Sequence, residues 1–304
     1  MTPRGEFFSF GNVAIDDLVY ADGSTMWEIP GGGAVYAALG MALWTGSAAV
    51  AAPSGADYPR ERFSALDFRA SRRIPHSMRN WGLYETDGSR HFITRRDSLP
   101  WEAFSSDTGE LDAGPYPYCH IAPMPMRRAG DLIAALRGRG ARAISVDPHE
   151  RELAAHGLAG CAALLAGATI FMPSRQDCRV LFGGIAPLDA LRALRARFAH
   201  LPVIAVKCDA DGALVHAAGT ADVVTIPSAG TSVVDATGAG DSFCGGFLAG
   251  YAADGDIAEA ALRGTVAASF ALAAVGPAAL SAATPALAEA RLAALRPRLG
   301  RIAL

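Results

Sequence analysis

The chain has 304 residues, of which 51% are hydrophobic and 19% are charged, and its formal net charge is −3. This composition supports a sizeable buried core and excludes extensive disorder. The nearly balanced charge, without a long basic run, argues against nucleic acid or an anionic membrane surface as the main partner.

Short apolar runs alternate with amphipathic or alanine-rich runs along the chain. The apolar runs predict strands at Phe7–Val13, Ala48–Ala52, Tyr118–Ala122, Ala143–Asp147, Thr169–Met172 and Val203–Lys207. The intervening runs predict helices, among them Ala34–Trp44, Ala129–Arg137 and Leu188–Phe198. This alternation is typical of βαβ units, so we expect an α/β fold with a mainly parallel central sheet and helices on both faces. No repeat or linker divides the chain, which predicts one domain over residues 1–304.

Two segments depart from this alternation. Residues 15–29 contain a turn signal at Asp22-Gly23, and residues 78–96 contain one at Asp87-Gly88. Alternating residues flank both turns, so we predict two β-hairpins. The pattern alone leaves open whether they form a lid over the α/β body or lie on the surface as ordinary hairpins.

Five cysteines are scattered along the chain without a C-x-x-C pair, which is typical of reduced thiols. The N-terminal segment lacks the pattern of a signal peptide. The longest uncharged run, residues 264–288, contains two prolines and predicts a buried helix followed by a loop rather than a membrane span. We therefore expect a cytoplasmic protein.

The stretch DATGAGDSFCGGF, residues 235–247, carries the main chemical signal. Gly238, Ala239 and Gly240 precede an apolar run that can form a helix. Free N–H groups and the positive dipole end at a helix N-terminus favour an anion, and glycines let a phosphate approach the backbone. Asp241 in the first turn could cap the helix, or it could act as a general base in phosphoryl transfer. The residues alone leave both roles open.

Other catalytic motifs are absent or incomplete. A Walker A loop is excluded because Lys207, the chain's one lysine, has no preceding glycine pattern. The run GDSFCG around Ser242 is one residue too long for a nucleophile elbow, and no base follows at a recognisable spacing, so a hydrolase has little support. The histidines of HERELAAH are seven residues apart, which argues against a zinc protease site.

The sequence DATGAGDSFCGGF resembles the C-terminal signature D-T-x-G-A-G-D-x-F of the ribokinase-like (PfkB) carbohydrate kinases. Further similar segments follow in the family's order: GNVAID (11–16), PGGGAVYAALG (30–40), PSGADYP (53–59) and DPHER (147–151). The resemblance covers nearly the whole chain. It implies a ribokinase-like fold in which the two hairpins form a β-sheet lid.

The resemblance implies an ATP-dependent kinase that transfers the γ-phosphoryl group to a primary hydroxyl of a sugar or sugar-like alcohol, with Mg²⁺. Asp241 would be the catalytic base, and the backbone amides of Gly238, Ala239 and Gly240 would form the anion hole. Asp235 would help to bind a monovalent cation such as K⁺, although a turn-stabilising role is the alternative. Some relatives form homodimers through the lid, which makes that assembly an expectation here.

The acceptor would contact Asp16 and the glycines Gly31, Gly32 and Gly33. Tyr36 replaces the asparagine that usually contacts substrate in this family, which favours an apolar or ring-stacking acceptor pocket. Trp81 and Tyr84 on the predicted lid favour the same pocket. A nucleoside kinase of the same fold is therefore an alternative to a sugar kinase.

Two further motifs depart from the family pattern. The family's N-x-x-E reads Ser174 to Asp177 here, and Asp177 would hold a water bound to Mg²⁺. At the nucleotide motif T-x-G-x-x-G, Lys207 and Asp209 replace Thr and the first Gly, whereas Gly212 is kept. We expect Lys207 to face ATP phosphates, with a solvent-exposed strand end as its alternative. These departures leave a catalytically inactive ligand-binding relative as another alternative.

Overall fold

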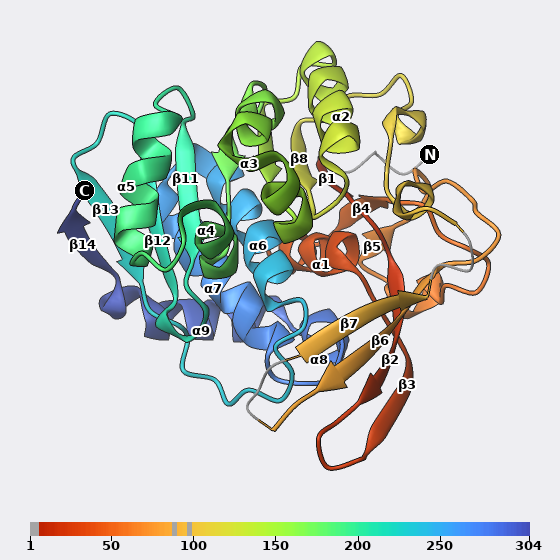
Figure 1. Cartoon of the computed structure of the whole chain (residues 1–304). Helices are drawn as coiled ribbons and strands as arrows, with labels where there is room; N and C mark the ends of the chain where they lie inside the picture. The colour runs from red at the N-terminus through yellow and green to blue at the C-terminus, as the bar shows by residue number, and fades with distance from the viewer. Residues whose placement is uncertain (1–5, 87–89, 96–98) are drawn as a thin grey trace.

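The computed structural model, which describes residues 6–86, 90–95 and 99–304, contains a large sheet between two layers of helices and a small sheet at one end (Figure 1). In spatial order, the large sheet consists of β14 (Gly300–Ala303), β13 (Asp222–Ile226), β12 (Ala213–Ala217), β11 (Val203–Lys207), β10 (Ile170–Phe171), β9 (Ala143–Val146), β8 (Tyr118–Ile121), β1 (Phe7–Phe10), β4 (Ala48–Ala51) and β5 (Leu66–Asp67). All neighbours from β11 to β5 run parallel, whereas β12, β13 and β14 add antiparallel pairs. The predicted mainly parallel sheet is confirmed.

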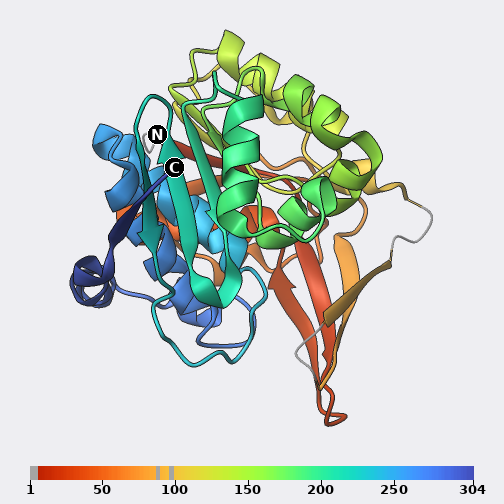
Figure 2. The same ribbon diagram turned by 60° about the vertical axis from the view of Figure 1, so that its left-hand side comes forward.

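Helices cover both faces of the large sheet, as expected (Figure 2). One layer contains α1 (Gly33–Thr45), α6 (Ala239–Asp254), α7 (Ile257–Ala271), α8 (Ala278–Ser281) and α9 (Pro285–Leu295). The other contains α2 (Met126–Gly138), α3 (Glu150–Leu165), α4 (Arg175–Phe182) and α5 (Pro187–Arg197). Side chains alternate along each strand, so Phe7 joins the first buried apolar cluster and Phe8 the second.

Glycines hold α6 directly against its neighbours. A Cβ on Gly245 would overlap the carbonyl oxygen of Ala37 in α1, and a Cβ on Gly246 would lie 2.7 Å from the carbonyl oxygen of Arg263 in α7. The backbones of these helices therefore touch, which only glycine permits. This packing fixes where the N-terminus of α6 lies relative to α1.

The small sheet consists of β3 (Thr25–Gly31), β2 (Ala14–Val19), β6 (Met78–Tyr84) and β7 (Arg90–Arg95), in that order. The antiparallel pairs β2–β3 and β6–β7 confirm the two predicted hairpins, and β2 joins them by pairing parallel with β6. The first turn lies at Asp22-Gly23 as predicted, closed by the Tyr20 N–H donating to Ser24 O at 2.9 Å. The second predicted turn, at Asp87-Gly88, lies outside the described residues.

Two other segments differ in detail from the prediction. The strand predicted over Phe7–Val13 ends at Phe10, and the chain then enters β2 of the small sheet at Ala14. The uncharged run of residues 264–288 contains the end of α7, all of α8 and the start of α9. Among the residues that the structure describes, no helix has both the length and the apolar character needed to cross a bilayer.

Candidate active site

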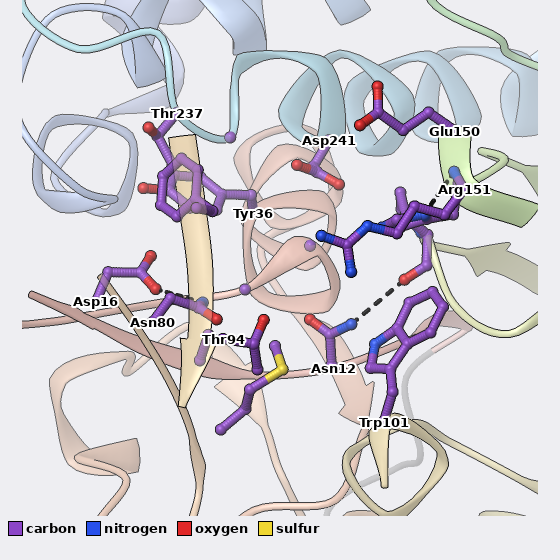
Figure 3. A pocket seen from close by; sticks show the side chains of 18 residues that line it. Asn12, Asp16, Tyr36, Asn80, Thr94, Trp101, Glu150, Arg151, Thr237 and Asp241 are labelled. Carbon is purple, nitrogen blue, oxygen red and sulfur yellow. Dashed lines mark hydrogen bonds between the residues drawn. The ribbon is translucent and has the colours of Figure 1, made fainter. Parts of the chain in front are cut away.

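A pocket of about 430 Å³ lies between the small sheet and the N-terminal end of α6 (Figure 3). Its lining includes the predicted site residues Asp16, Gly32, Gly33, Tyr36, Gly238 and Asp241. These residues come from β2, the start of α1 and the start of α6. Residues from three separate sequence motifs are thus brought together in one cavity by the fold.

Asp241 lies in the first turn of α6, and its carboxylate points into the pocket (Figure 3). The N-cap of this helix is Gly238, with a left-handed φ of 74°. A glycine N-cap has no side chain that could bond the first N–H groups of the helix. The N-terminus of α6, where Ala239 and Gly240 follow, can therefore accept an anionic group next to Asp241.

The glycines at the start of α1 allow two close approaches. Gly32 has a φ of 101°, and a Cβ there would lie 2.6 Å from Asn12 O. A Cβ on Gly33 would lie 2.8 Å from Asp241 Oδ1. Gly31 does not line the pocket; its carbonyl oxygen accepts a hydrogen bond of 2.8 Å from the Tyr58 hydroxyl. Gly31 therefore supports the wall rather than forming it.

Tyr36 forms a buried part of the pocket wall beside the start of α6 (Figure 3). A Cβ on Gly238 would overlap its ring, so the glycine is required by contact as well as by its positive φ. Burial raises the pKa of the Tyr36 hydroxyl well above its usual value, and the neighbouring carboxylates raise it further. The side chain is therefore a neutral ring surface at physiological pH.

Asp16 lines the pocket together with Asn80, a residue that sequence reasoning missed. Asn80 on β6 donates a hydrogen bond of 2.7 Å from Nδ2 to Asp16 Oδ1. Burial raises the pKa of Asp16 to about 6, although the bond from Asn80 opposes this rise. The two side chains together offer both acceptors and donors to a hydroxyl-bearing ligand.

The remaining wall is formed by residues that were assigned no role from the sequence. These lining residues are Asn12, Ala14, Met78, Phe92, Thr94, Trp101, Pro123, His149, Glu150, Arg151 and Thr237. The Arg151 guanidinium points into the pocket, and the ring centroids of Trp101 and His149 lie 4.6 Å apart (Figure 3). Arg151 belongs to the DPHER segment, residues 147–151. The family resemblance of this segment could therefore have identified Arg151 as a pocket residue.

The expectation that Trp81 would favour a ring-stacking pocket is wrong. Trp81 does not line the cavity; its side chain is 43% exposed, and the Arg95 guanidinium lies 5.0 Å from its ring centroid. Successive side chains on a strand point to opposite faces. Because Asn80 faces the pocket, its neighbour Trp81 must face outward.

Lys207 lies below the N-terminus of α6 rather than in the pocket. Its ammonium forms a buried ion pair with Asp147, and Nζ lies 3.5 Å from the sulfur of Cys244. Burial acts to lower the pKa of Lys207, but the Asp147 carboxylate outweighs it and the pKa is raised. A Cβ on Gly240 would lie 3.5 Å from Nζ, so the positive charge sits close beneath the helix N-terminus.

Asp209 and Gly212 lie in the turn after β11, away from the pocket lining. Asp209 is exposed, has a φ of 54° and lies 3.6 Å from Arg175 Nε. Gly212 has a φ of 91°, and a Cβ there would overlap Ile226 O. A glycine at this position is thus demanded by backbone packing against the end of β13.

Asp177 is buried at the start of α4 and forms a capping box with Ser174. Its Oδ2 accepts hydrogen bonds from Ser174 N at 2.7 Å and Ser174 Oγ at 2.6 Å. Across the described ranges, no group of three or more His, Cys, Asp or Glu side chains could hold a metal ion.

Asp235 is buried in the loop that precedes α6. Its Oδ1 accepts hydrogen bonds from the Tyr84 hydroxyl at 2.8 Å and from Thr237 N at 2.9 Å. Its Oδ2 accepts one from Gly276 N at 3.3 Å. The segment before α8 therefore contacts Asp235 through the N–H group of Gly276.

Comparison with known proteins identifies relatives of this arrangement. Residues 133–284 match the family described as pfkB family carbohydrate kinase. A cytidine kinase of Thermococcus kodakarensis is 28% identical over 253 residues, which cover 79% of this chain and 86% of that protein. An uncharacterized sugar kinase of Archaeoglobus fulgidus is 35% identical over 116 residues, 38% of this chain and 44% of that protein.

Solved structures share the fold over nearly the whole chain. The nucleoside kinase of Methanocaldococcus jannaschii has a TM-score of 0.72 at 18% identity, covering 96% of this chain and 99% of that one. The adenosine kinase of Sinorhizobium meliloti has a TM-score of 0.75 at 19% identity, covering 96% and 100%. At these identities, the likeness shows the ribokinase fold and nothing finer.

Proposed function

The chain belongs to the pfkB family of carbohydrate kinases, and on that basis we propose that it transfers the γ-phosphoryl group of ATP to a primary hydroxyl of a sugar-like or nucleoside acceptor. The observation that carries the proposal is the place of Asp241. Its carboxylate points into the pocket from the first turn of α6, next to the glycine-rich start of that helix. A base and an anion-binding helix end thus meet at one point.

In the proposed reaction, Asp241 accepts the proton of the acceptor hydroxyl as its oxygen attacks the γ-phosphorus. The backbone amides of Gly238, Ala239 and Gly240 stabilise the charge on the transferring group, supported by the helix dipole. The buried Lys207 ammonium adds positive charge beneath Gly240. When bound, Mg²⁺ neutralises phosphate charge, and Asp177 would hold it through water.

The acceptor binds in the cavity with its hydroxyls against Asp16 and Asn80, whose bonded pair can both accept and donate. The small sheet acts as a lid, since Phe92 and Thr94 of β7 line the same cavity. Arg151 points into the pocket opposite Asp16 and supplies positive charge for the phosphate. In this proposal, the reacting hydroxyl lies between the acceptor site and α6.

A nucleoside is a second candidate acceptor, favoured by the ring surfaces of the wall. Tyr36, Phe92 and Trp101 all line the cavity, and a base can stack on such surfaces. The cytidine kinase relative supports the same interpretation, because 79% of this chain aligns with it. A nucleoside would present its 5′-hydroxyl, a primary alcohol, to Asp241.

The test is ADP release from Mg-ATP with a panel of pentoses, hexoses, sugar phosphates and nucleosides. We expect Asp241→Asn to lower kcat by about a thousandfold, the range of general base contributions, while the protein stays folded and binds ligand. Asp254→Asn, at the other end of the same helix, is the matched control and keeps wild-type turnover. Turnover in Asp241→Asn near the wild-type value contradicts the role of Asp241. ATP binding without turnover for any acceptor supports an inactive ligand-binding relative instead.

A further inference from the structure

Tyr84 connects the small sheet to the loop before α6. It is the last residue of β6, and its hydroxyl donates to Asp235 Oδ1 at 2.8 Å. The same oxygen lies 2.7 Å from Thr237 Oγ1. The ring is held on its own sheet by Tyr20, whose centroid lies 5.0 Å away. One hydroxyl therefore joins the two sides of the cavity.

These contacts determine the shape of the loop that leads into the anion hole. Asp235 Oδ1 also accepts from Thr237 N at 2.9 Å, which closes a tight turn directly before Gly238. Gly238 then takes its left-handed φ of 74° against the ring of Tyr36. A displacement of Asp235 or Thr237 would move the amides that are proposed to receive the phosphate.

The same contacts do not fit an alkali-metal cation at Asp235. Such an ion binds through oxygen lone pairs, and it competes with hydrogen-bond donors for them. Here the Tyr84 hydroxyl and Thr237 N approach Oδ1, and Gly276 N approaches Oδ2. Both oxygens of the Asp235 carboxylate thus already accept hydrogen bonds, and the two to Oδ1 occupy both of its lone pairs.

We propose that Tyr84 is a positioning residue for phosphoryl transfer, and that its hydroxyl takes the place of a monovalent cation in ordering residues 235–238. The hydroxyl links the small sheet to the loop before α6 and orders that loop, whereas other residues line the acceptor pocket. The inference rests on the proposed function of Asp241 and the amides of residues 238–240. It adds a residue that lies outside the cavity and acts through Asp235.

The first test compares Tyr84→Phe with Tyr20→Phe in the full-length enzyme. Tyr84→Phe removes only the hydroxyl and keeps the ring against Tyr20, so we expect kcat to fall about tenfold, as for loss of a hydrogen bond to a charged group. The KM values for ATP and acceptor stay within about threefold, since the lost contact acts on the transition state. The control Tyr20→Phe removes a hydroxyl that bonds Met26 Sδ within the small sheet, and keeps wild-type kinetics.

Hydrogen exchange supplies a readout that does not depend on turnover. We expect the peptide spanning residues 233–241 to exchange faster in Tyr84→Phe than in the wild type or Tyr20→Phe. Wild-type kcat together with wild-type exchange in Tyr84→Phe overturns the positioning role. A wild type without turnover on any acceptor contradicts the proposed function alone, because the exchange comparison still decides whether Tyr84 orders the loop.

The dependence of turnover on potassium tests whether the Tyr84 hydroxyl replaces a monovalent cation. We expect wild-type turnover to agree within about twofold in potassium, sodium and choline chloride at equal ionic strength, because the Tyr84 hydroxyl already bonds the Asp235 carboxylate. Activation by potassium of tenfold or more over choline overturns the replacement of the cation.

Discussion

Gly33 and Asp241 lie side by side in the wall of the candidate pocket, so closely that a Cβ on Gly33 would lie 2.8 Å from Asp241 Oδ1. The Cβ of Ala122 would lie 3.3 Å away on another side, which leaves the added methyl group little freedom. We therefore expect Gly33→Ala to displace the carboxylate and lower kcat about a hundredfold, as small misplacements of catalytic groups do. Steady-state kinetics and thermal unfolding would measure the effect.

The matched control for Gly33→Ala is Gly130→Ala on α2. A Cβ at Gly130 would meet no atom of the described residues within 4 Å. This variant should keep wild-type kcat and gain slightly in stability, because alanine favours a helix over glycine. Equal kcat in both variants would show that the Gly33 contact does not position Asp241.

Acceptor binding should depend on the ionisation of Asp16. Burial raises the pKa of this carboxyl to about 6, and only its ionised form accepts hydrogen bonds at both oxygens. We expect the acceptor KM to rise as the pH falls below about 6, and Asp16→Asn to bind acceptor weakly without that pH dependence. Initial rates from pH 5 to 8 at saturating ATP would test this; a KM constant over that range contradicts it.

The raised pKa of Asp16 also predicts that lower pH stabilises the folded state, although it weakens acceptor binding. The folded state holds the Asp16 proton more tightly than the unfolded chain, in which the carboxyl has its ordinary pKa of 3.8. Protonation therefore stabilises the fold fully below about pH 4, and this contribution is lost as the pH rises through about 6. Asp16→Asn should raise the Tm at pH 8 but not at pH 4, and the corresponding gain in unfolding free energy at pH 8 is on the order of 3 kcal/mol at most. A Tm gain equal at both pH values would contradict the linkage.

The buried pair of Lys207 and Asp147 predicts both a stability and a nucleotide effect. Lys207→Met leaves the Asp147 carboxylate buried without its counter-charge, which should cost about 3 kcal/mol of unfolding free energy. The double variant Lys207→Met/Asp147→Asn should recover part of that loss, since both charges are gone. The ATP KM should rise in both variants because the positive charge beneath Gly240 is absent. An unchanged ATP KM in both would remove Lys207 from phosphate binding.

The outer face of the small sheet predicts self-association. Trp81 and Ile93 are directly opposite each other on β6 and β7, and their side chains are 43% and 49% exposed. The homodimer expected from the sequence resemblance would bury this apolar pair. Light scattering should show that Trp81→Gln/Ile93→Thr is monomeric. The control Leu287→Ser changes a residue on α9 that is also 49% exposed and should leave the assembly unchanged.

The sequence by itself determined the features that depend on local pattern. Apolar runs specified β1, β4, β8, β9, β10 and β11 of the large sheet, because strands buried between two helix layers are apolar on both faces. Strands β5, β12, β13 and β14 were not predicted from the sequence. The segment GAGD marked the start of α6, because a glycine-rich turn before an apolar run is typical of an anion-binding helix end. Asp241 could therefore be identified as a candidate for capping or catalysis from the residues alone, whereas Asp16 was identified through the resemblance of GNVAID to the family's first strand.

Only the tertiary structure decided which side chains meet. Trp81 and Asn80 are neighbours in sequence, yet strand register directs one to solvent and the other to Asp16 on β2. Tyr84 bonds Asp235, 151 residues away, because the small sheet docks at the start of α6. Such contacts depend on how separate elements pack against each other, and the hydrophobic pattern of a single segment does not predict them. The roles proposed for individual residues therefore depend on the assembled fold.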